Sequence, residues 1–473
     1  MTRIFKPYPN YKDSRHIWLG NIPEHWQTLR CKYIFQEVDE RSKTGLETHL
    51  SMSQIHGLVD NSKVEKWRLQ SESHIGSKLC QPNDLVLNRL KAHLGVFAHA
   101  KVSGLVSPDY TVLRLVSDGN VRYFEALFKT PLYITEFARS TKGIVKGFWR
   151  LYTEDFYNIT SIVPPKNEQE TILSFITVKN NQIHKFIQKK RRLIEVLKEQ
   201  KQVIINQAVT KGMDPNVDLK PSGVDYLGDI PEHWEARRLR TIATVKPSGV
   251  DKNTAEDEIS VFLCNYVDVY KNDYITPDLS FMKATASQAE IDNFKLRAGD
   301  VLITKDSEDW ADIAVPAYVA TDFEDVICAY HLAVIRPNAG LILGEYLFRA
   351  FSSELIADQF RVSANGITRY GLSQNGIKSA FFPLPPIEEQ EKIIEHITNG
   401  CKEIDTAITK AKREIELIHE YRISLICDVV TGKVDVRDIP VEPVEDIEEI
   451  DDLDEIQESE ELTELQEVTD ADD

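Results

Sequence analysis

This chain contains two copies of one proline-led sequence: Pro164-Pro165-Lys166-Asn167-Glu168-Gln169-Glu170 and, 221 residues later, Pro385-Pro386-Ile387-Glu388-Glu389-Gln390-Glu391. Paired prolines cannot lie inside a helix, so they mark the entry to one. Acidic residues in a first turn suit the positive end of the helix dipole. The next prolines are Pro215 and Pro440, and Gly212 and Gly432 are typical C-terminal stops. The pattern predicts one long helix used twice, over residues 164–212 and 385–433.

An apolar seam follows each opening, with steps of seven residues offset by three and four, like heptad a and d positions. In the second copy it comprises Ile394, Ile397, Cys401, Ile404, Ile408, Ala411, Ile415, Ile418, Leu425 and Val429. In the first copy the same positions are Leu173, Ile176, Asn180, Ile183, Ile187, Lys190, Ile194, Leu197, Ile204 and Ala208. A seam this long needs a partner, and the other copy is the simplest one. The alternative is an ordinary pair of core helices.

A second repeat precedes the two globular parts. Residues 18–26, with the sequence WLGNIPEHW, return as residues 226–234, with the sequence YLGDIPEHW. The order is therefore repeat, globular part and helix, twice over, which indicates domain duplication because the period is far longer than in solenoids. His25 and His233 recur without a second ligand at metal spacing, so we expect them to pack or cap and expect no metal site.

Matching elements are expected inside the two globular parts, residues 27–163 and 235–384. Residues 85–88 and 301–304 each follow a turn signal and predict strands, as do residues 111–115 and 332–336. Residues 121–139 and 344–360 have helical spacing of aromatic and leucine residues. Residues 29–35 and 239–245 are expected to begin a first strand. The predicted fold class is α+β.

Charge is concentrated at the end of the chain. The net charge is −19, and residues 441–473 hold 17 acidic residues and no Lys or Arg. The rest therefore holds 58 acidic and 56 basic residues, a balance that leaves room for a basic face. Residues 434–473 are predicted to be a disordered acidic tail. The tail either keeps the chain soluble or competes with nucleic acid for a basic groove, and truncation after Ile439 would then tighten non-specific DNA binding.

Location and chemistry are constrained by what the sequence lacks. Six scattered cysteines form no C-x-x-C pair, and neither a secretory signal nor a membrane-spanning run is present, so a cytoplasmic protein is expected. A phosphate-binding GxxxxGK[S/T] loop, a GxGxxG turn and an Asp/Asn-Pro-Pro-aromatic methyltransferase motif are also missing. We therefore expect no catalytic residues in this chain.

The chain resembles the specificity subunit of Type I restriction–modification systems. The resemblance rests on the duplicated Leu-Gly-x-Ile-Pro-x-x-Trp region, the Pro-Pro-x-x-Glu-Gln helix entries and the two divergent parts, and it covers residues from about 15 to 435. It implies two target-recognition domains that each read half of a bipartite double-stranded DNA sequence, held apart by an antiparallel coiled coil. It further implies docking of two modification (methyltransferase) subunits and of restriction subunits. S-adenosylmethionine, ATP and Mg²⁺ would then bind to those partners, with no cofactor in this chain.

On this basis the chain divides into an N-terminal segment with the first recognition domain (residues 1–163), a first helix (164–212), a linker with the second recognition domain (213–384), a second helix (385–433) and the tail (434–473). Lengthening or shortening the helices should change the spacer between half-sites and leave each half-site intact, because DNA turns once in about 34–36 Å.

DNA-contacting residues are expected in loops that combine glycine with cationic and aromatic side chains. In the first part the candidates are Lys91, His93, Lys142, Lys146, Trp149 and Arg150. In the second part they are Lys305, Asn365, Thr368, Arg369 and Tyr370. The alternative for any one of them is a solvated loop residue. Replacing Arg369 by Ala should weaken DNA binding by about 1–3 kcal/mol if it pairs with guanine, and by less if it meets only phosphate.

Two other functions fit parts of the sequence. A coiled-coil adaptor whose globular parts bind proteins would explain the helices, but it has no need for two divergent domains in one duplicated frame. A specificity factor for a methylation-based defence without a cleaving subunit would look the same in this chain.

Overall fold

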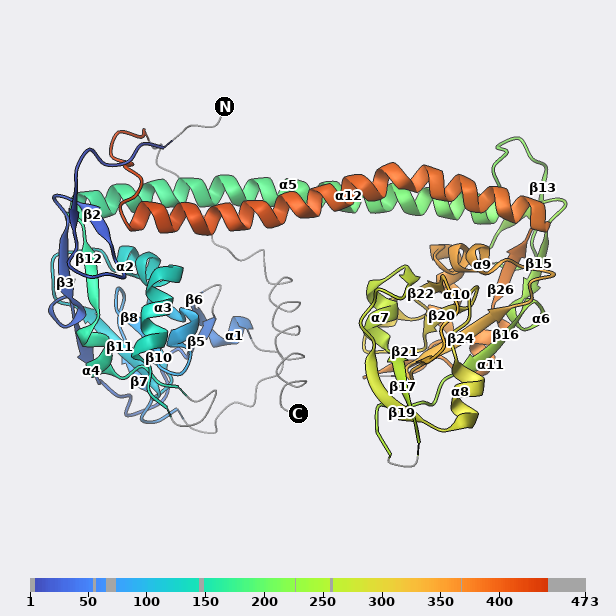
Figure 1. Cartoon of the computed structure of the whole chain (residues 1–473), viewed down its shortest axis with the longest axis horizontal. Coiled ribbons are helices and arrows are strands. Elements are labelled where there is room, and N and C mark those ends of the chain that lie inside the picture. Colours follow the sequence, from blue (N-terminus) through green and yellow to red (C-terminus); the bar gives the residue numbers. More distant parts are fainter. Residues whose placement is uncertain are drawn as a thin grey trace. The chain divides into compact units, whose positions relative to one another are not determined.

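The computed structural model describes residues 5–53, 57–64, 74–143, 149–225, 227–255, 258–366 and 368–440. It divides into two compact units (Figure 1). Unit 1 comprises Met1–Lys189 together with Arg413–Asp473, and unit 2 comprises Lys190–Lys412. Within the described ranges, no helix is both long enough and apolar enough to cross a bilayer.

Unit 1 is built on a four-stranded antiparallel sheet in the order β4-β11-β8-β9. Its strands are β4 (Phe35–Val38), β11 (Tyr110–Leu115), β8 (Leu85–Asn88) and β9 (Phe97–His99). Four antiparallel pairs surround the sheet: β1 (Tyr11–Asp13) with β2 (Asn21–Pro23), β3 (Gln27–Arg30) with β12 (Thr160–Val163), β5 (Leu50–Ser53) with β6 (Gly57–Asp60), and β7 (Lys78–Cys80) with β10 (Gly104–Val106).

The helices of unit 1 pack their aromatic residues against the sheet. They are η1 (Cys31–Tyr33), α1 (Asn61–Val64), η2 (Ala92–Leu94), α2 (Val121–Phe128), α3 (Pro131–Ser140) and α4 (Thr153–Asn158). Fully buried rings from strands and helices form one cluster that includes Phe35, Phe97, Phe124, Phe128, Phe137 and Phe156. Burial of this aromatic surface stabilises the unit.

Unit 2 has the same sheet with one strand added, in the order β16-β24-β20-β22-β18. These strands are β16 (Ala243–Pro247), β24 (Leu332–Pro337), β20 (Val301–Thr304), β22 (Pro316–Val319) and β18 (Tyr274–Ile275). A second sheet combines β19 (Met282–Ala286), β17 (Ile259–Cys264) and β23 (Val326–Cys328). The remaining pairs are β13 (Leu219–Pro221) with β14 (Asp229–Pro231), β15 (Glu235–Arg238) with β26 (Phe381–Leu384), and β21 (Asp306–Ser307) with β25 (Tyr370–Gly371).

The helices of unit 2 follow the order seen in unit 1, with additions before β20. They are α6 (Leu239–Ile242), α7 (Tyr266–Lys271), α8 (Gln288–Phe294), η3 (Trp310–Asp312), α9 (Gly344–Phe351), α10 (Glu354–Ser363) and α11 (Gln374–Ser379). In each unit a helix pair follows the later central strand, and a short helix then leads into the strand that precedes a long helix.

One ion pair with a buried carboxylate is present in both sheets. Arg114 of β11 donates two hydrogen bonds, of 2.8 and 2.9 Å, to the buried carboxylate of Asp84, which precedes β8. Arg336 of β24 donates two, each of 2.7 Å, to the buried Asp300, which precedes β20. A two-point guanidinium–carboxylate contact fixes both position and angle. The turn before the strand is therefore tied to the neighbouring strand in the same way in both units.

The structure contains the two long helices that the sequence predicts, with nearly the predicted ends. α5 runs from Lys166 to Lys211 and α12 from Ile387 to Val430. Every seam position predicted above is buried or half-buried in both helices. Gly212 and Gly432 end the helices with φ of +75° and +79°, a conformation that glycine adopts at little cost.

Within each unit, segments of the two helices pack side by side. In unit 1, Arg422 of α12 donates a hydrogen bond of 3.0 Å to the Asn180 side chain of α5. In unit 2, Lys201 of α5 forms an ion pair of 2.8 Å with Asp405 of α12. Residues near the start of one helix therefore lie beside residues near the end of the other, which is an antiparallel arrangement in both units.

The Glu-Gln pair at each helix entry joins the helix to its globular part. Gln169 accepts a hydrogen bond of 2.8 Å from the backbone of Asn120, the residue that caps α2. Gln390 accepts one of 2.8 Å from the backbone of Leu343, which precedes α9. Both glutamine side chains are buried. The glutamate immediately before each glutamine binds the second repeat.

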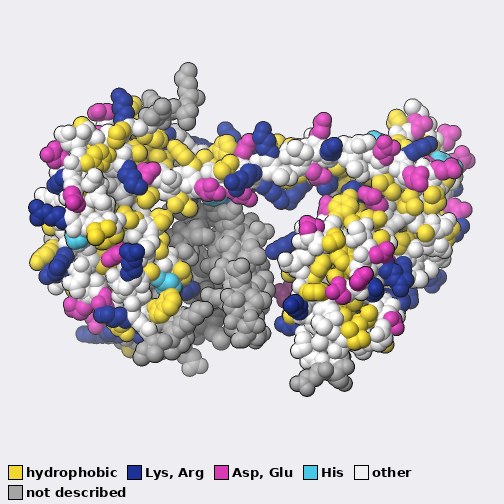
Figure 2. All heavy atoms as spheres, in the orientation of Figure 1, with side chains coloured by type: hydrophobic (Ala, Val, Ile, Leu, Met, Phe, Trp, Pro, Cys, Tyr) yellow, Lys and Arg dark blue, Asp and Glu magenta, His cyan; other side chains and the backbone are white. Residues whose placement is uncertain are grey.

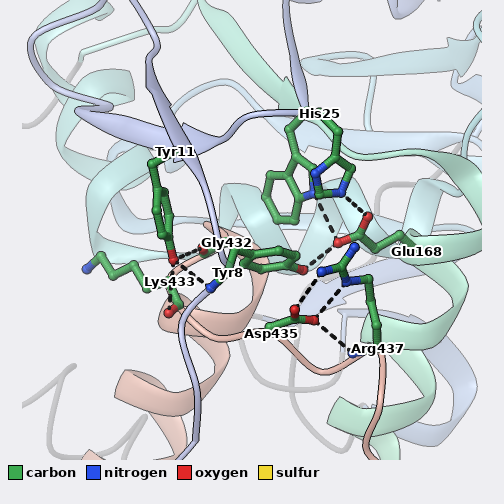
Figure 3. A network of polar contacts seen from close by, with 9 residues as sticks. Tyr8, Tyr11, His25, Glu168, Gly432, Lys433, Asp435 and Arg437 are labelled. Atoms are coloured by element: carbon green, nitrogen blue, oxygen red, sulfur yellow. Dashed lines mark hydrogen bonds and ion pairs between the residues drawn. The ribbon is translucent and has the colours of Figure 1, made fainter.

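We use "clasp" for the contact of each entry glutamate with the His-Trp pair of the second repeat. In unit 1, Glu168 binds His25 Nε2 at 2.8 Å and accepts a hydrogen bond of 3.1 Å from Trp26 Nε1 (Figure 3). In unit 2, Glu389 binds His233 Nε2 at 2.8 Å and accepts one of 3.0 Å from Trp234 Nε1. In each unit, the second repeat therefore contacts the helix-entry repeat. This contact holds the helix entry against strand pair β1–β2 in unit 1 and against strand pair β13–β14 in unit 2.

The unit 1 clasp carries further contacts. The Tyr8 hydroxyl also donates to Glu168, and burial together with that carboxylate raises the pKa of Tyr8 (Figure 3). The Arg437 guanidinium lies 4.9 Å from the centre of the Tyr8 ring and pairs with Asp435. The Glu168 side chain is only 4% exposed, whereas that of Glu389 is 25% exposed.

Three sequence predictions need correction. Each predicted helix over 121–139 and 344–360 is two helices. In unit 1 the break occurs where Thr130 caps the new helix and Pro131 cannot continue the old one. Residues 31–33 and 239–242 form short helical turns, so the first central strand begins only at Phe35 and Ala243.

Residues 434–440, assigned above to the tail, are part of unit 1. Val436 is fully buried in its core, and the Asp435 backbone donates a hydrogen bond of 2.8 Å to the carbonyl of Lys6. The remainder of the predicted tail, residues 441–473, lies outside the described residues.

Candidate nucleic-acid interface

In unit 2, three segments far apart in the sequence meet beyond the end of β20. The Lys305 backbone donates a hydrogen bond of 2.9 Å to the carbonyl of His331, and its own carbonyl accepts one of 2.8 Å from Leu372. β21 and β25 then pair Ser307 with Tyr370. The predicted residues Lys305 and Arg369 are thereby brought onto one surface.

The side chains of Lys305 and Arg369 form a row of polar contacts with Asp306 and His331. These last two residues were not predicted from the sequence. Lys305 pairs with Asp306, whose Oδ2 lies 3.4 Å from His331 Nδ1. Nη2 of Arg369 lies 3.0 Å from Nε2 and 3.3 Å from Nδ1 of the same imidazole. Burial, with the charges of Arg369 and Lys305, outweighs Asp306 and lowers the pKa of His331. Because Nη2 lies this close to both ring nitrogens, the guanidinium lies over the face of the imidazole and disfavours its charged form.

Exposed aromatic rings lie around this cluster. The Tyr330 ring lies against His331, with 3.6 Å between ring centres. Trp310 of η3 is 51% exposed and lies beside the Arg361 guanidinium, and Tyr270 stacks on Tyr266. Rings presented to solvent beside guanidinium groups suit contact with sugar and base surfaces.

The other predicted residues of unit 2 differ in their exposure. Asn365 and Thr368 are exposed, and the Asn365 backbone pairs with Gly371 in a bridge that closes the loop. Tyr370 is half-buried and packs against the core of unit 2. Part of its side chain therefore packs inward and supports the loop.

In unit 1 the predicted residues gather around η2. Lys91 precedes this turn, and His93 within it contacts the Trp149 ring edge to face, with 5.9 Å between ring centres. Lys142 and Arg150 form a two-way backbone bridge, and Lys142 pairs with Asp155 at 2.6 Å. Lys146 lies outside the described residues.

Position in the fold relates the two groups of residues. Lys91 follows β8 as Lys305 follows the equivalent strand β20, and each group includes a short 3₁₀ turn and the loop after a helix pair. Their chemistry differs, since unit 1 presents mainly cations and unit 2 alternates Lys305, Asp306, His331 and Arg369. Over the visible face of both units, Lys and Arg side chains are interleaved with Asp and Glu (Figure 2).

Comparison with known proteins matches this architecture to one family. The model of the Type I restriction modification DNA specificity domain matches residues 231–417. The MjaVIII specificity subunit of a type I restriction enzyme from Methanocaldococcus jannaschii is 22% identical over 445 residues, which cover 91% of this chain and 97% of that relative. Residues 231–417 therefore match the Type I specificity domain, and most of the chain is similar to a Type I specificity subunit.

Other specificity subunits align over less of their length. The MjaX specificity subunit of the same archaeon is 23% identical over 211 residues, which cover 44% of this chain and 48% of that relative, so this chain spans about half of it. Among solved structures, a chain from a study of complex assembly and conformational transition of the type I R-M system has a TM-score of 0.60 at 13% identity. The match covers 87% of this chain and 99% of that one. That likeness shows a shared fold.

Sequence reasoning missed several side chains of these two candidate surfaces. Asp306 and His331 lie directly beside a predicted strand end, and Trp310 begins the turn that corresponds to η2. Arg89, in unit 1, follows β8 and donates a hydrogen bond of 2.6 Å to the carbonyl of Asp109. The ends of the strands that correspond between the two units could have pointed to these residues, because such ends place side chains from distant segments on one surface.

Proposed function

We propose that this specificity subunit recognises a bipartite double-stranded DNA target, with each unit reading one half. The observation that carries the proposal is one sheet frame, with its buried Asp–Arg pair and its clasp, present in both units beneath surfaces of different chemistry. A conserved frame with divergent contact residues is expected when two domains dock on the same kind of ligand and discriminate differently.

We further propose that the units arose by tandem duplication and that α5 and α12 form an antiparallel coiled coil that sets the spacer between half-sites. The matched heptad registers and the antiparallel packing of the helix segments inside each unit support this. Two modification subunits and the restriction subunits would bind this chain and supply the methyl donor, ATP and Mg²⁺ chemistry, leaving recognition to the specificity subunit.

Methylation mapping in cells tests the proposal directly. The chain is co-expressed with its modification partner, and the modified motif is read by methylome sequencing. Replacing residues 243–379 by the corresponding segment of another family member should change one half of the motif and leave the other half unchanged. A motif that changes in both halves, or in neither, would contradict the assignment of one half-site to each unit.

The Arg369→Ala variant tests the surface itself. We expect its affinity for the mapped duplex to fall by about 1–3 kcal/mol if Arg369 reads a guanine, and by less if it meets only phosphate. Arg237→Ala is the matched control, because Arg237 lies on β15, pairs with Glu235 and belongs to none of the segments that form the cluster. Competition between target and scrambled duplexes separates the outcomes, since loss of a base contact lowers the preference and loss of a phosphate contact does not.

A further inference from the structure

The contact between Arg369 and His331 has a consequence for DNA binding. His331 is held on three sides: Asp306 faces Nδ1, the Tyr330 ring lies against the imidazole, and Arg369 contacts both ring nitrogens. Lys305 lies behind Asp306 and pairs with it. The imidazole is half-buried, with 18% of its side chain exposed, while Arg369 is exposed.

The position of Arg369 disfavours a charged histidine. Its Nη2 lies within 3.3 Å of both ring nitrogens, so the guanidinium lies over the face of the imidazole. A proton on the ring would place a second positive charge about 3 Å from the first. The unbound protein therefore keeps His331 neutral while Arg369 occupies this position.

A DNA phosphate changes this balance. Phosphate oxygens form strong two-point contacts with guanidinium groups, so a bound phosphate draws Arg369 away from the imidazole. It also adds a negative charge next to His331, which favours the imidazolium form. Asp306 already faces the ring and would stabilise that form on its other side.

We propose that His331 is a positioning residue that holds Arg369 until DNA binds, and that DNA binding at unit 2 is accompanied by uptake of one proton at His331. This inference rests on the proposed function. Affinity for DNA should then increase as the pH falls, because the bound state carries the proton over a range where the free state does not.

The experiment uses the full chain and a fluorescent duplex that carries the motif mapped by methylome sequencing, with a scrambled duplex beside it. Dissociation constants are measured at constant ionic strength from about pH 8 to about pH 5.5. We expect the wild-type affinity for the target duplex to increase by about three- to tenfold, since each pKa unit of difference between bound and free states gives up to a factor of about ten.

His331→Gln removes the group that takes up the proton. Glutamine keeps a polar side chain of similar length but does not titrate, so the increase in affinity at low pH should disappear. His396→Gln is the matched control, because His396 is exposed on α12, and it should keep the wild-type pH profile. Asp306→Asn, which keeps the shape of the site, should reduce the increase.

Titration calorimetry in buffers of different ionisation enthalpy counts the protons directly. Wild-type binding should take up a fraction of a proton near pH 6.5, and the His331→Gln variant should lose that fraction. An unchanged pH profile in both His331→Gln and Asp306→Asn overturns the inference, as does a flat wild-type profile with tight target binding. Equal affinity for target and scrambled duplexes at every pH would instead contradict the proposed function itself.

Discussion

Individual side chains in this protein are often placed by partners from distant segments, and the buried Asp–Arg pairs illustrate this. In the sequence, Asp84 and Asp300 belong only to the turn signals before two predicted strands, and their arginines only to the later predicted strands. Antiparallel pairing of β8 with β11 and of β20 with β24 brings the partners together. Sequence periodicity predicts the strands, whereas the contact depends on strand register.

Arg336→Ala should strongly destabilise unit 2. It leaves the Asp300 carboxylate buried without its cation, a change that costs about 3–5 kcal/mol in other proteins. Urea unfolding, followed by circular dichroism, measures the loss. Arg237→Ala, which breaks an exposed pair with Glu235, should cost less than about 1 kcal/mol. Similar losses of unfolding free energy in the two variants would show that the Asp300–Arg336 pair stabilises the unit no more than an exposed pair does.

Glu125 should make unit 1 sensitive to acid. Burial opposes its ionisation, but hydrogen bonding from His99 and the charge of Lys129 prevail and lower its pKa from 4.5 to about 2. A lowered pKa gives stability that is present above about pH 4.5 and is lost as the pH falls towards 2. Wild type should therefore lose up to about 3 kcal/mol more than Glu125→Gln across this range. Parallel pH profiles of unfolding free energy for the two proteins would rule this out.

Helices and repeats were the most predictable elements. Proline pairs, heptad spacing and C-terminal glycines located α5 and α12 to within three residues at each end, because these signals are local. The break between α2 and α3 was missed, although Pro131 was visible, because helical spacing continues across it. In the candidate site, Arg369 was predicted from its loop, while His331 required knowledge of which strand lies beside β20.

The two clasps should differ in strength. Glu168→Ala leaves the buried Trp26 and Tyr8 donors without their acceptor, so we expect a loss of about 3 kcal/mol or more. Glu389→Ala removes the same contacts with His233 and Trp234 at a more exposed site, and about 1–2 kcal/mol is expected. Hydrogen exchange of β1–β2 and β13–β14 measures each loss locally. Greater loosening at β13–β14 would contradict this order.

At the scale of the whole molecule, helix length is the property that the proposed function depends on most. Removing one heptad from each helix, residues 195–201 and 403–409, keeps both heptad registers in step and shortens each by about 10 Å. The spacer in the methylated motif should then shorten by about three base pairs while both half-sites persist. Methylome sequencing reads spacer and half-sites together, and an unaltered spacer would count against a coiled coil that sets it.

The paired clasps give this protein an experimental advantage of its own. The same contact of a glutamate with a histidine and a tryptophan occurs twice in one polypeptide. In unit 1 it is covered by Tyr8 and Arg437, whereas in unit 2 it is more exposed to water. Temperature, salt and expression history are the same for both. Any difference in their response to one substitution therefore reports the influence of surroundings alone, so the molecule supplies its own internal standard.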